Sequence, residues 1–250
     1  MRRHILASTF IGAALSAAAG GAPFINHSKP ASLLDFEVHA LIGGSAITQN
    51  YQKSFPQISE LATSMGVSGG IGAEATANFS DFLALGMEIN FLANNFKMNT
   101  AVADDDATSI TNVFVKNRFY TFNFPVFMRF NFNLGNSVRW NLDAGGFYSY
   151  GITGTSSTTL YSALVNPVGQ LITSVTSEDY KYYNSDNTFI ASSWRGDFGF
   201  HFGTGLTVRR CVRLGVSSQI GLKNVAHAYN AVKTPRVHNY NVMCSLGWCF

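Results

Sequence analysis

Charged residues are scarce in this chain, and many of them recur at alternate positions within apolar segments. Asp, Glu, Lys and Arg make up 12% of the 250 residues. Alternate side chains of a β-strand share one face, so these acids and bases are expected on a common polar face. Charges in a confined space are tolerated when they pair and hydrogen-bond. We therefore predict a structural network of paired interior charges: Glu37, Glu74, Glu88, Arg129, Arg139, Asp143, Arg195, Asp197, Arg213 and Lys223.

Three other groupings could do chemistry, and each has a simpler interpretation. Ser217, His201 and Glu88 contain the residue types of a Ser/His/acid hydrolase, but no spacing connects them. Residues 70–72 (Gly-Ile-Gly) resemble the start of a dinucleotide loop, although no helical pattern follows. The three aspartates at 104–106 lack the glycine and distal glutamate of a calcium loop. We expect no catalytic residue, no metal ligand and no cofactor.

The cysteines suggest a disulfide. Cys211 and Cys249 fall at the same end of two predicted neighbouring strands and have the same inward parity. A compartment outside the cytoplasm permits disulfides, and a bridge requires Cα atoms within about 7 Å. A Cys211–Cys249 bridge is therefore predicted as possible, whereas Cys244 has the opposite parity and is expected to be free.

The elements that position these residues are amphipathic strands. In the clearest case the apolar side chains of one face are Tyr120, Phe122, Phe124, Val126, Met128, Phe130 and Phe132, and the opposite face carries Thr, Asn and Arg. This period of two is typical of a strand between a polar and an apolar environment. It recurs in eight segments, at about 34–42, 64–79, 83–91, 120–132, 138–152, 194–208, 212–222 and 238–250.

The connections between these segments alternate in length. Tight turns are expected at 78–81, 134–137 and 209–211, and long loops at about 49–63, 97–114, 155–193 and 226–236. Short turns on one side and long loops on the other are typical of outer-membrane barrels. We predict an all-β fold, an eight-stranded antiparallel up-and-down transmembrane β-barrel; a secreted β-sandwich is the alternative. Residues 160–176 could add two strands, giving ten, but a hairpin above the membrane is favoured.

An interior of eight strands is just wide enough for side chains to fill. The mixed charges are therefore expected to plug the barrel, so that it forms no open pore. The formal net charge of +3 falls to about +1 without Arg2 and Arg3. No basic patch favours nucleic acid as a partner.

The two ends of the chain predict export and insertion. Residues 1–22, with Arg2 and Arg3 before an apolar stretch, are predicted to be a signal peptide, and 23–250 the barrel domain. The last strand should pair with the first to remove both free edges. Trp248 and Phe250 are then expected in an aromatic belt, with both termini of the mature protein in the periplasm. Phe250 also resembles the C-terminal signal that barrel assembly machinery reads.

Three motifs resemble a known family. They are RFYTFNFPVFMRF at 118–130, LDAGGFYSY at 142–150 and DFGFHFGTG at 197–205, followed by the aromatic last strand. With these, the chain resembles the PorT-like outer-membrane β-barrel proteins of Bacteroidetes over nearly its whole mature length. The resemblance implies a barrel in the cell outer membrane and, from one family member, a link to protein secretion. It implies no catalytic residues.

The function expected from the sequence is that of a non-enzymatic integral outer-membrane protein. It would act in envelope structure, in support of secretion or in partner binding through its extracellular loops. Its partners would be outer-membrane lipid, the barrel assembly machinery and an unidentified secretion or surface partner. The first alternative is a surface adhesin that uses the loop at 155–193, rich in Tyr, Ser and Thr; the second is a lipid-modifying enzyme.

Overall fold

The structure is a computed structural model that describes residues 23–54, 58–103, 109–165, 168–184, 192–227 and 234–250. The predicted signal peptide at 1–22 and the aspartates at 104–106 lie outside these residues. Nearly all of the described chain is β-strand: β1 Leu34–Gln49, β2 Ile58–Asn78, β3 Leu83–Ala103, β4 Ser109–Asn133, β5 Val138–Val165, β6 Leu171–Lys181, β7 Ser192–Ser193, β8 Gly196–Val208, β9 Val212–Gly221, β10 Ala226–His227 and β11 Val237–Cys249, with one short helix, α2 Tyr51–Ser54.

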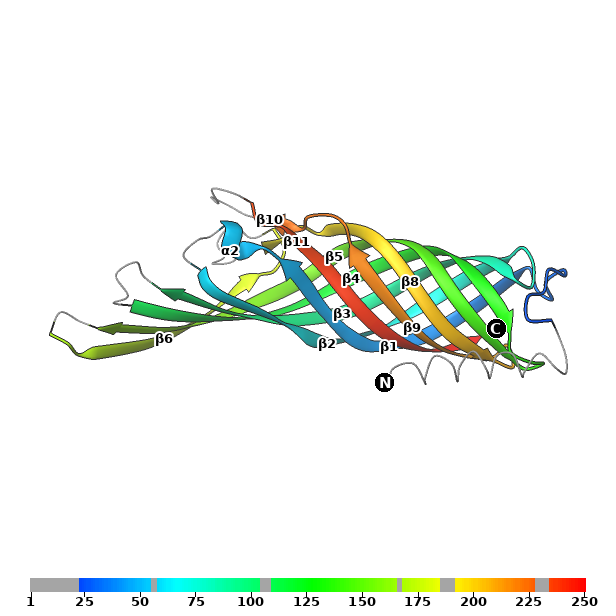
Figure 1. Ribbon diagram of the computed structural model, residues 1–250, viewed down its shortest axis with the longest axis horizontal. Coiled ribbons are helices and arrows are strands. Elements are labelled where there is room, and N and C mark those ends of the chain that lie inside the picture. Colours follow the sequence, from blue (N-terminus) through cyan, green and yellow to red (C-terminus); the bar gives the residue numbers. More distant parts are fainter. Residues whose placement is uncertain (1–22, 55–57, 104–108, 166–167, 185–191, 228–233) are drawn as a thin grey trace, which may run out of the picture.

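Eight of the strands close into a ring in which every neighbouring pair is antiparallel. The order is β1-β2-β3-β4-β5-β8-β9-β11, and β11 returns to pair with β1 from Glu37↔Cys249 to Gln49↔Val237 (Figure 1). The prediction of an eight-stranded antiparallel up-and-down barrel is thus confirmed. Closure between the first and last strands satisfies the backbone groups that both edges would otherwise expose.

The alternation of side chains separates the two faces of the wall. On β4, Phe122 and Val126 are 41% and 47% exposed, whereas Thr121 and Asn123 are 6% and 2% exposed. The exposed apolar set continues around the ring: Phe36, Val38, Ile42, Ile71, Met87, Ile89, Phe91, Tyr148, Tyr150, Phe198, Phe200, Phe202, Leu214, Val216, Ile220, Leu246 and Trp248. The wall is therefore apolar outside and polar inside, as predicted.

The barrel has two different ends. The turn end carries the short connections 79–82, 134–137 and 209–211, and also the start of β1 and Phe250. Here the backbone of Asn133 donates to the Phe24 carbonyl (2.9 Å), and the Phe24 ring stacks on Phe132 at 5.0 Å. The segment before β1 is thus held against the rim. The opposite end, where the long connections lie, is called the loop end below.

At the loop end the strands are longer than predicted. The segment 97–114, expected as a loop, is mostly paired strand, because β3 runs to Ala103 and β4 starts at Ser109. The prediction failed because apolar side chains there also lie on the inner face, where Met98, Val113 and Val115 are buried. The outer face is mixed, with Lys97 and Lys116 as well as the exposed Ile110 and Phe114. The strands are recognised in the sequence by apolar residues at every second, outward-facing position, and this segment has no continuous series of that kind.

The loop-end part of β5 and β6 pair with each other beyond the closed part of the ring. The upper part of β5 pairs with β6 from Thr155↔Lys181 to Val165↔Leu171, and β6 has no second partner among the described strands. β6 therefore adds no wall to the barrel, which confirms the preferred interpretation of eight ring strands. The hairpin projects from the loop end together with the extensions of β3 and β4 (Figure 1).

An apolar core closes the loop end from inside. The Tyr182 ring stacks on Phe119 at 4.4 Å, and Tyr183 meets the same ring edge-on at 6.1 Å. Burial raises the pKa of both tyrosine hydroxyls, which therefore stay protonated. The remaining members come from many strands and from α2: Ile47, Tyr51, Ile58, Phe96, Met98, Val113, Val115, Val225, Ala226 and Val237. No helix in the described part of the chain is long and apolar enough to cross a membrane.

Close backbone packing inside the wall makes a prediction about two adjacent glycines. A Cβ on Gly145 would lie 2.1 Å from the Val126 carbonyl oxygen and 2.5 Å from the Phe127 Cα, whereas one on Gly146 meets only the Gly199 oxygen at 3.3 Å. We expect Gly145→Ala to lower the free energy of unfolding by about 1–3 kcal/mol, because backbone must shift.

The matched control, Gly146→Ala, should change it by less than about 0.5 kcal/mol. Urea unfolding of the folded protein in detergent, followed by tryptophan fluorescence, measures both. Equal losses for the two variants would contradict the described packing.

Candidate functional site

The centre of the barrel holds a cluster of buried charges from five strands. Arg129 on β4 donates from Nε to Asp143 Oδ1 (2.8 Å) and from Nη2 to Glu74 Oε2 (2.9 Å). Arg213 on β9 donates from Nη1 to Glu74 Oε2 (2.8 Å) and from Nη2 to Asp143 Oδ2 (2.5 Å). The Glu37 carboxylate lies 3.8 Å from Arg213 Nη1. All five side chains are buried, and we call them the central charge cluster.

Strand register explains why these residues meet. Glu37 is directly opposite Glu74 across β1 and β2, and Arg129 is directly opposite Asp143 across β4 and β5. Arg213 reaches into the interior from β9 and binds both Glu74 and Asp143. Arg129 makes paired contacts with both carboxylates, and Arg213 makes one hydrogen bond to each, so the arrangement is rigid as well as charge-compensated.

A polar chain continues from the cluster along β1 and β3. His39 Nδ1 lies 3.3 Å from Glu37 Oε1, and His39 Nε2 is 2.7 Å from Asn90 Oδ1. Asn90 donates its amide to Glu88 Oε2 at 2.7 Å. Glu88 therefore joins through hydrogen bonds and forms no ion pair with a described cation.

The structure divides the ten predicted network residues. Five form the central charge cluster, and Glu88 is attached through Asn90. Arg139 instead pairs with Asp81 at the turn end, 2.6 Å away. Arg195 donates to the Gly151 carbonyl at 2.8 Å.

Asp197 accepts from the Asn239 amide at 2.8 Å and forms no ion pair with a described cation. Lys223 forms none with a described acid; its Nζ lies near β8, 3.6 Å from where a Cβ on Gly196 would be. The alternation of the sequence assigns all ten side chains to the inner face, but it does not give their position along the barrel axis. Arg195, Asp197 and Lys223 lie nearer the loop end than the central charge cluster.

The predicted Cys211–Cys249 bridge is not formed in the structure, where Cys211, Cys244 and Cys249 are free thiols. The two strand ends do meet, because the Cys249 backbone donates to the Cys211 carbonyl at 2.7 Å. The Cys249 side chain, however, points toward Glu37, with Sγ 3.5 Å from Oε2. The inward parity of Cys249 is thus as predicted, but the neighbour of its thiol is Glu37 and not Cys211.

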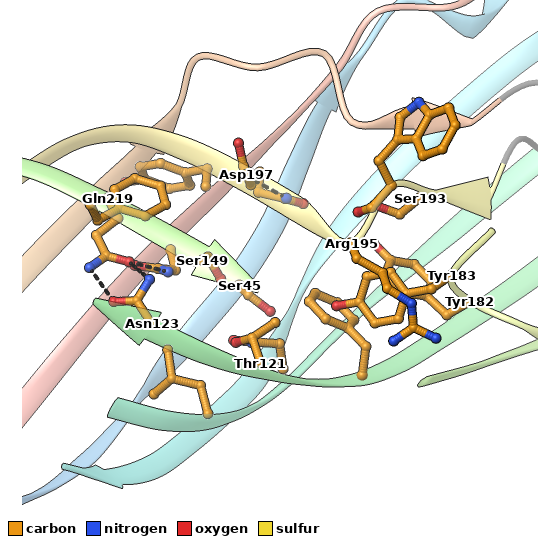
Figure 2. A pocket seen from close by; sticks show the side chains of 18 of the residues that line it. Ser45, Thr121, Asn123, Ser149, Tyr182, Tyr183, Ser193, Arg195, Asp197 and Gln219 are labelled. Carbon is orange, nitrogen blue, oxygen red and sulfur yellow. Dashed lines mark hydrogen bonds between the residues drawn. The ribbon is translucent and has the colours of Figure 1, made fainter. Parts of the chain in front are cut away.

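Toward the loop end, amides replace the charges. Asn123 and Gln219 exchange two hydrogen bonds, of 3.0 and 2.9 Å, and Asn241 donates to Gln219 at 3.1 Å. Figure 2 shows this pair on one side of a pocket and Tyr182, Tyr183 and Arg195 on the other. The pocket measures only ≈ 40 Å³, which is room for a few water molecules at most.

At the turn end a larger cavity of ≈ 330 Å³ opens below the central charge cluster. Its walls carry both signs of charge, including Asp35, Asp81, Arg139 and Arg210. The central charge cluster closes the inner end of this cavity, so the cavity does not continue as a channel through the barrel.

The candidate hydrolase residues do not form a catalytic set. Ser217, His201 and Glu88 line a common interior cavity of ≈ 20 Å³. His201 Nδ1 is 3.1 Å from the Gln219 amide nitrogen, and its ring stacks on Phe127 at 5.3 Å. No hydrogen bond joins the three candidates in the described structure, and no group of three metal-ligating side chains occurs among the described residues.

Trp248 and Phe250 lie on the outside at the turn end, and their place in a periplasmic aromatic belt stays a prediction. They are 52% and 73% exposed, and the Phe250 backbone donates to the Phe36 carbonyl at 2.8 Å. Recognition by assembly machinery stays a prediction.

Comparisons with known proteins find solved barrels of similar fold, but they do not assign the chain to a family. No family model matches the chain, so the PorT-like resemblance stays a prediction, and no curated protein is similar to it. Solved structures with a similar fold include the outer membrane protein OprG from Pseudomonas aeruginosa: 9% identity, TM-score 0.39, covering 90% of this chain and 98% of that one.

Two further solved structures have a similar fold. Ail, the attachment invasion locus protein of Yersinia pestis, solved with a heparin analogue, is 10% identical with a TM-score of 0.38 and covers 88% of this chain and 100% of its own. Neisserial surface protein A is 9% identical with a TM-score of 0.35 and covers 85% and 96%. At this level of similarity no function transfers.

The central charge cluster predicts unequal costs for two arginine substitutions. Arg129→Met leaves Glu74 and Asp143 buried with one cation between them, so we expect a loss of about 3–5 kcal/mol in unfolding free energy. Arg139→Met should cost only about 1 kcal/mol, because Asp81 is nearer the rim and has Arg210 at 3.9 Å. Urea unfolding in detergent measures the free energy of unfolding of both variants. A loss for Arg129→Met no larger than that for Arg139→Met would show that the central charge cluster does not stabilise the barrel.

Proposed function

We propose that this chain is a non-enzymatic integral outer-membrane protein whose barrel is plugged and whose loop end faces the exterior. The observation that carries the proposal is the change of polarity along the wall. Over the turn-end part of β4 the outer face is apolar and the inner face mostly polar. From Phe119 toward the loop end the buried inner residues include Val113 and Val115, whereas the charged Lys116 and Arg118 face outward beside the exposed Phe114. Such a change is expected where the surroundings change from lipid to water.

The apolar band has the height that a membrane requires. On β4 it runs from Phe130 to Tyr120, which spans about 33 Å along the strand and about 25 Å across a bilayer at the usual tilt. Phe91 stacks on Tyr120 at 5.9 Å and meets Phe122 at 5.6 Å, at the upper edge of this band. Aromatic residues concentrate at such interfaces.

The interior supports a structural or binding role over transport. The central charge cluster fills the cross-section, and the core under Tyr182 closes the loop end. The cavities between them hold ≈ 20 and ≈ 40 Å³, too little for a solute. The protein would then act through its surface, in envelope structure, secretion support or partner binding, and would be inserted by barrel assembly machinery that recognises β11.

A conductance measurement tests the plug. We expect the folded protein in a planar lipid bilayer to show no large, stable current steps, because the paired charges at the centre and the apolar core at the loop end block any path through the barrel. A general porin in the same bilayer serves as the positive control. Large, stable steps from the purified protein would contradict the proposal.

A second candidate, a surface adhesin or binding module, is favoured by the β5–β6 hairpin. β6 has a free edge among the described strands, and Ile172 and Val175 are 51% and 64% exposed. On the outer face of this hairpin Val175 pairs with Tyr161, whose ring meets Phe114 at 5.6 Å. An edge strand with apolar side chains is suited to strand addition by a partner peptide.

Shortening the hairpin tests this candidate. Thr159 and Ser177 are cross-strand partners whose hydroxyls are 2.7 Å apart. The pairs of β5 with β8 end at Tyr150, so replacing residues 160–176 by a two-residue Asn-Gly turn should leave the ring closed, although the pairs of β5 with β4 from Ser109↔Leu164 to Val113↔Leu160 are lost. Pull-downs from detergent-solubilised outer membranes with the full and shortened proteins should then differ in the captured partner; identical captures would exclude the hairpin as the binding element.

A further inference from the structure

Four cations gather on the outer wall just above the apolar band. Lys97 on β3 is the direct cross-strand partner of Lys116 on β4, and Arg118 follows two residues along the same strand and face. Arg118 pairs with Thr155, which pairs in turn with Lys181 on β6. All four side chains are exposed. We call them the boundary cation cluster.

These charges are not compensated within the described part of the chain. None of the four forms an ion pair there. Two acids share this face without reaching the cations: Asp179 is separated from Lys116 by Ser157 of the intervening strand, and Glu60 pairs with Ala101, four residues from Lys97 along β3. Like charges directly opposite each other destabilise a sheet, so the Lys97–Lys116 pair is best explained by an anion outside the protein.

The wall below the cluster is shaped for an apolar chain. An open groove of ≈ 950 Å³ runs over the outer faces of β1–β4 and β11, bounded by Phe91 and Phe122 at its upper end and Trp248 at the turn end. Small residues form part of its floor, among them Ala40, Gly72 and Ala73. Phe122, the cross-strand partner of Phe91, lies four residues from Arg118 on the same face of β4, with Tyr120 between them. The groove and the cations therefore share one side of the barrel.

We propose that the boundary cation cluster and this groove together bind a phosphorylated lipid of the leaflet surrounding the loop end, its phosphates on Lys97, Lys116 and Arg118 and an acyl chain in the groove. The inference rests on the proposed function, which places this level at the membrane surface. Lysine and arginine attract anionic headgroups there, and their stems can lie along the apolar wall. Their place on the side wall, next to the groove, favours a lipid over a soluble anion, which would have no acyl chain to bury.

The test is native mass spectrometry of the folded protein in detergent, with a diphosphorylated, acylated glucosamine disaccharide as the probe. Each cation removed should weaken binding about fivefold, so K97Q/K116Q should bind about 25-fold less tightly than the unchanged protein. The charge-conserving K97R/K116R should bind within about twofold of it. R209Q/R210Q, which removes the same charge from the turn end, is the matched control and should also bind normally.

Two further probes distinguish the source of the phosphate. The dephosphorylated lipid should lose most of the affinity, and inorganic phosphate at millimolar concentration should not displace the diphosphorylated lipid. Displacement by inorganic phosphate would overturn the assignment to lipid, and equal binding by K97Q/K116Q would overturn the site.

Insertion is measured separately, by carbonate extraction of reconstituted vesicles. If the unchanged protein is extracted from the vesicles, the proposed function fails. If it stays inserted while the cation variants bind lipid normally, only the lipid site fails. Far-UV circular dichroism of each variant establishes that a loss of binding is not a loss of β-structure.

Discussion

The pairing of β11 with β1 is the constraint on which the rest of the structure depends. A strand edge inside lipid would leave backbone N–H and C=O groups without partners, so a sheet in a membrane must close. Closure with eight strands leaves an interior of side-chain width. Polar side chains that point inward must then find partners inside the barrel, many of them on other strands, and the cluster of Glu74, Arg129, Asp143 and Arg213 is the result.

In the central charge cluster, closure of the barrel brings arginines next to acids that would otherwise repel each other, and the paired charges block the interior. Register places Glu37 opposite Glu74, an unfavourable pairing of like charge. Arg213, on β9, compensates both acids, and Arg129 adds a second guanidinium. Because the contacts link β1, β2, β4, β5 and β9, the same interactions that block the bore also fix the strands relative to one another.

The change of polarity beyond Phe119 organises the loop end. Lipid requires an apolar exterior, whereas water allows the apolar side chains to turn inward, where Phe96, Val113, Tyr182 and Tyr183 form a core of ordinary soluble character. The strands therefore continue past the membrane level and present the β5–β6 hairpin. The transition between the two regimes is also where exposed lysines and arginine can meet lipid headgroups.

The alternation of residues was enough to predict the eight strands, the tight turns and the outward apolar face, because a period of two is a local property that lipid imposes on every strand. It also identified the inward acids and bases. It could not decide which of them meet: Arg139, Arg195, Asp197 and Lys223 share the parity of Arg129, yet they lie at other heights along the barrel.

Only the tertiary structure decided those heights, because they depend on register and on the stagger between strands that are distant in sequence. The same reason explains the missed extensions of β3 and β4. Their apolar face is buried by Tyr182 and Tyr183, which come from a segment more than sixty residues away from Phe119 in the chain. The direction of the Cys249 thiol, toward Glu37 and away from a disulfide, likewise follows from a neighbour that the local sequence does not contain.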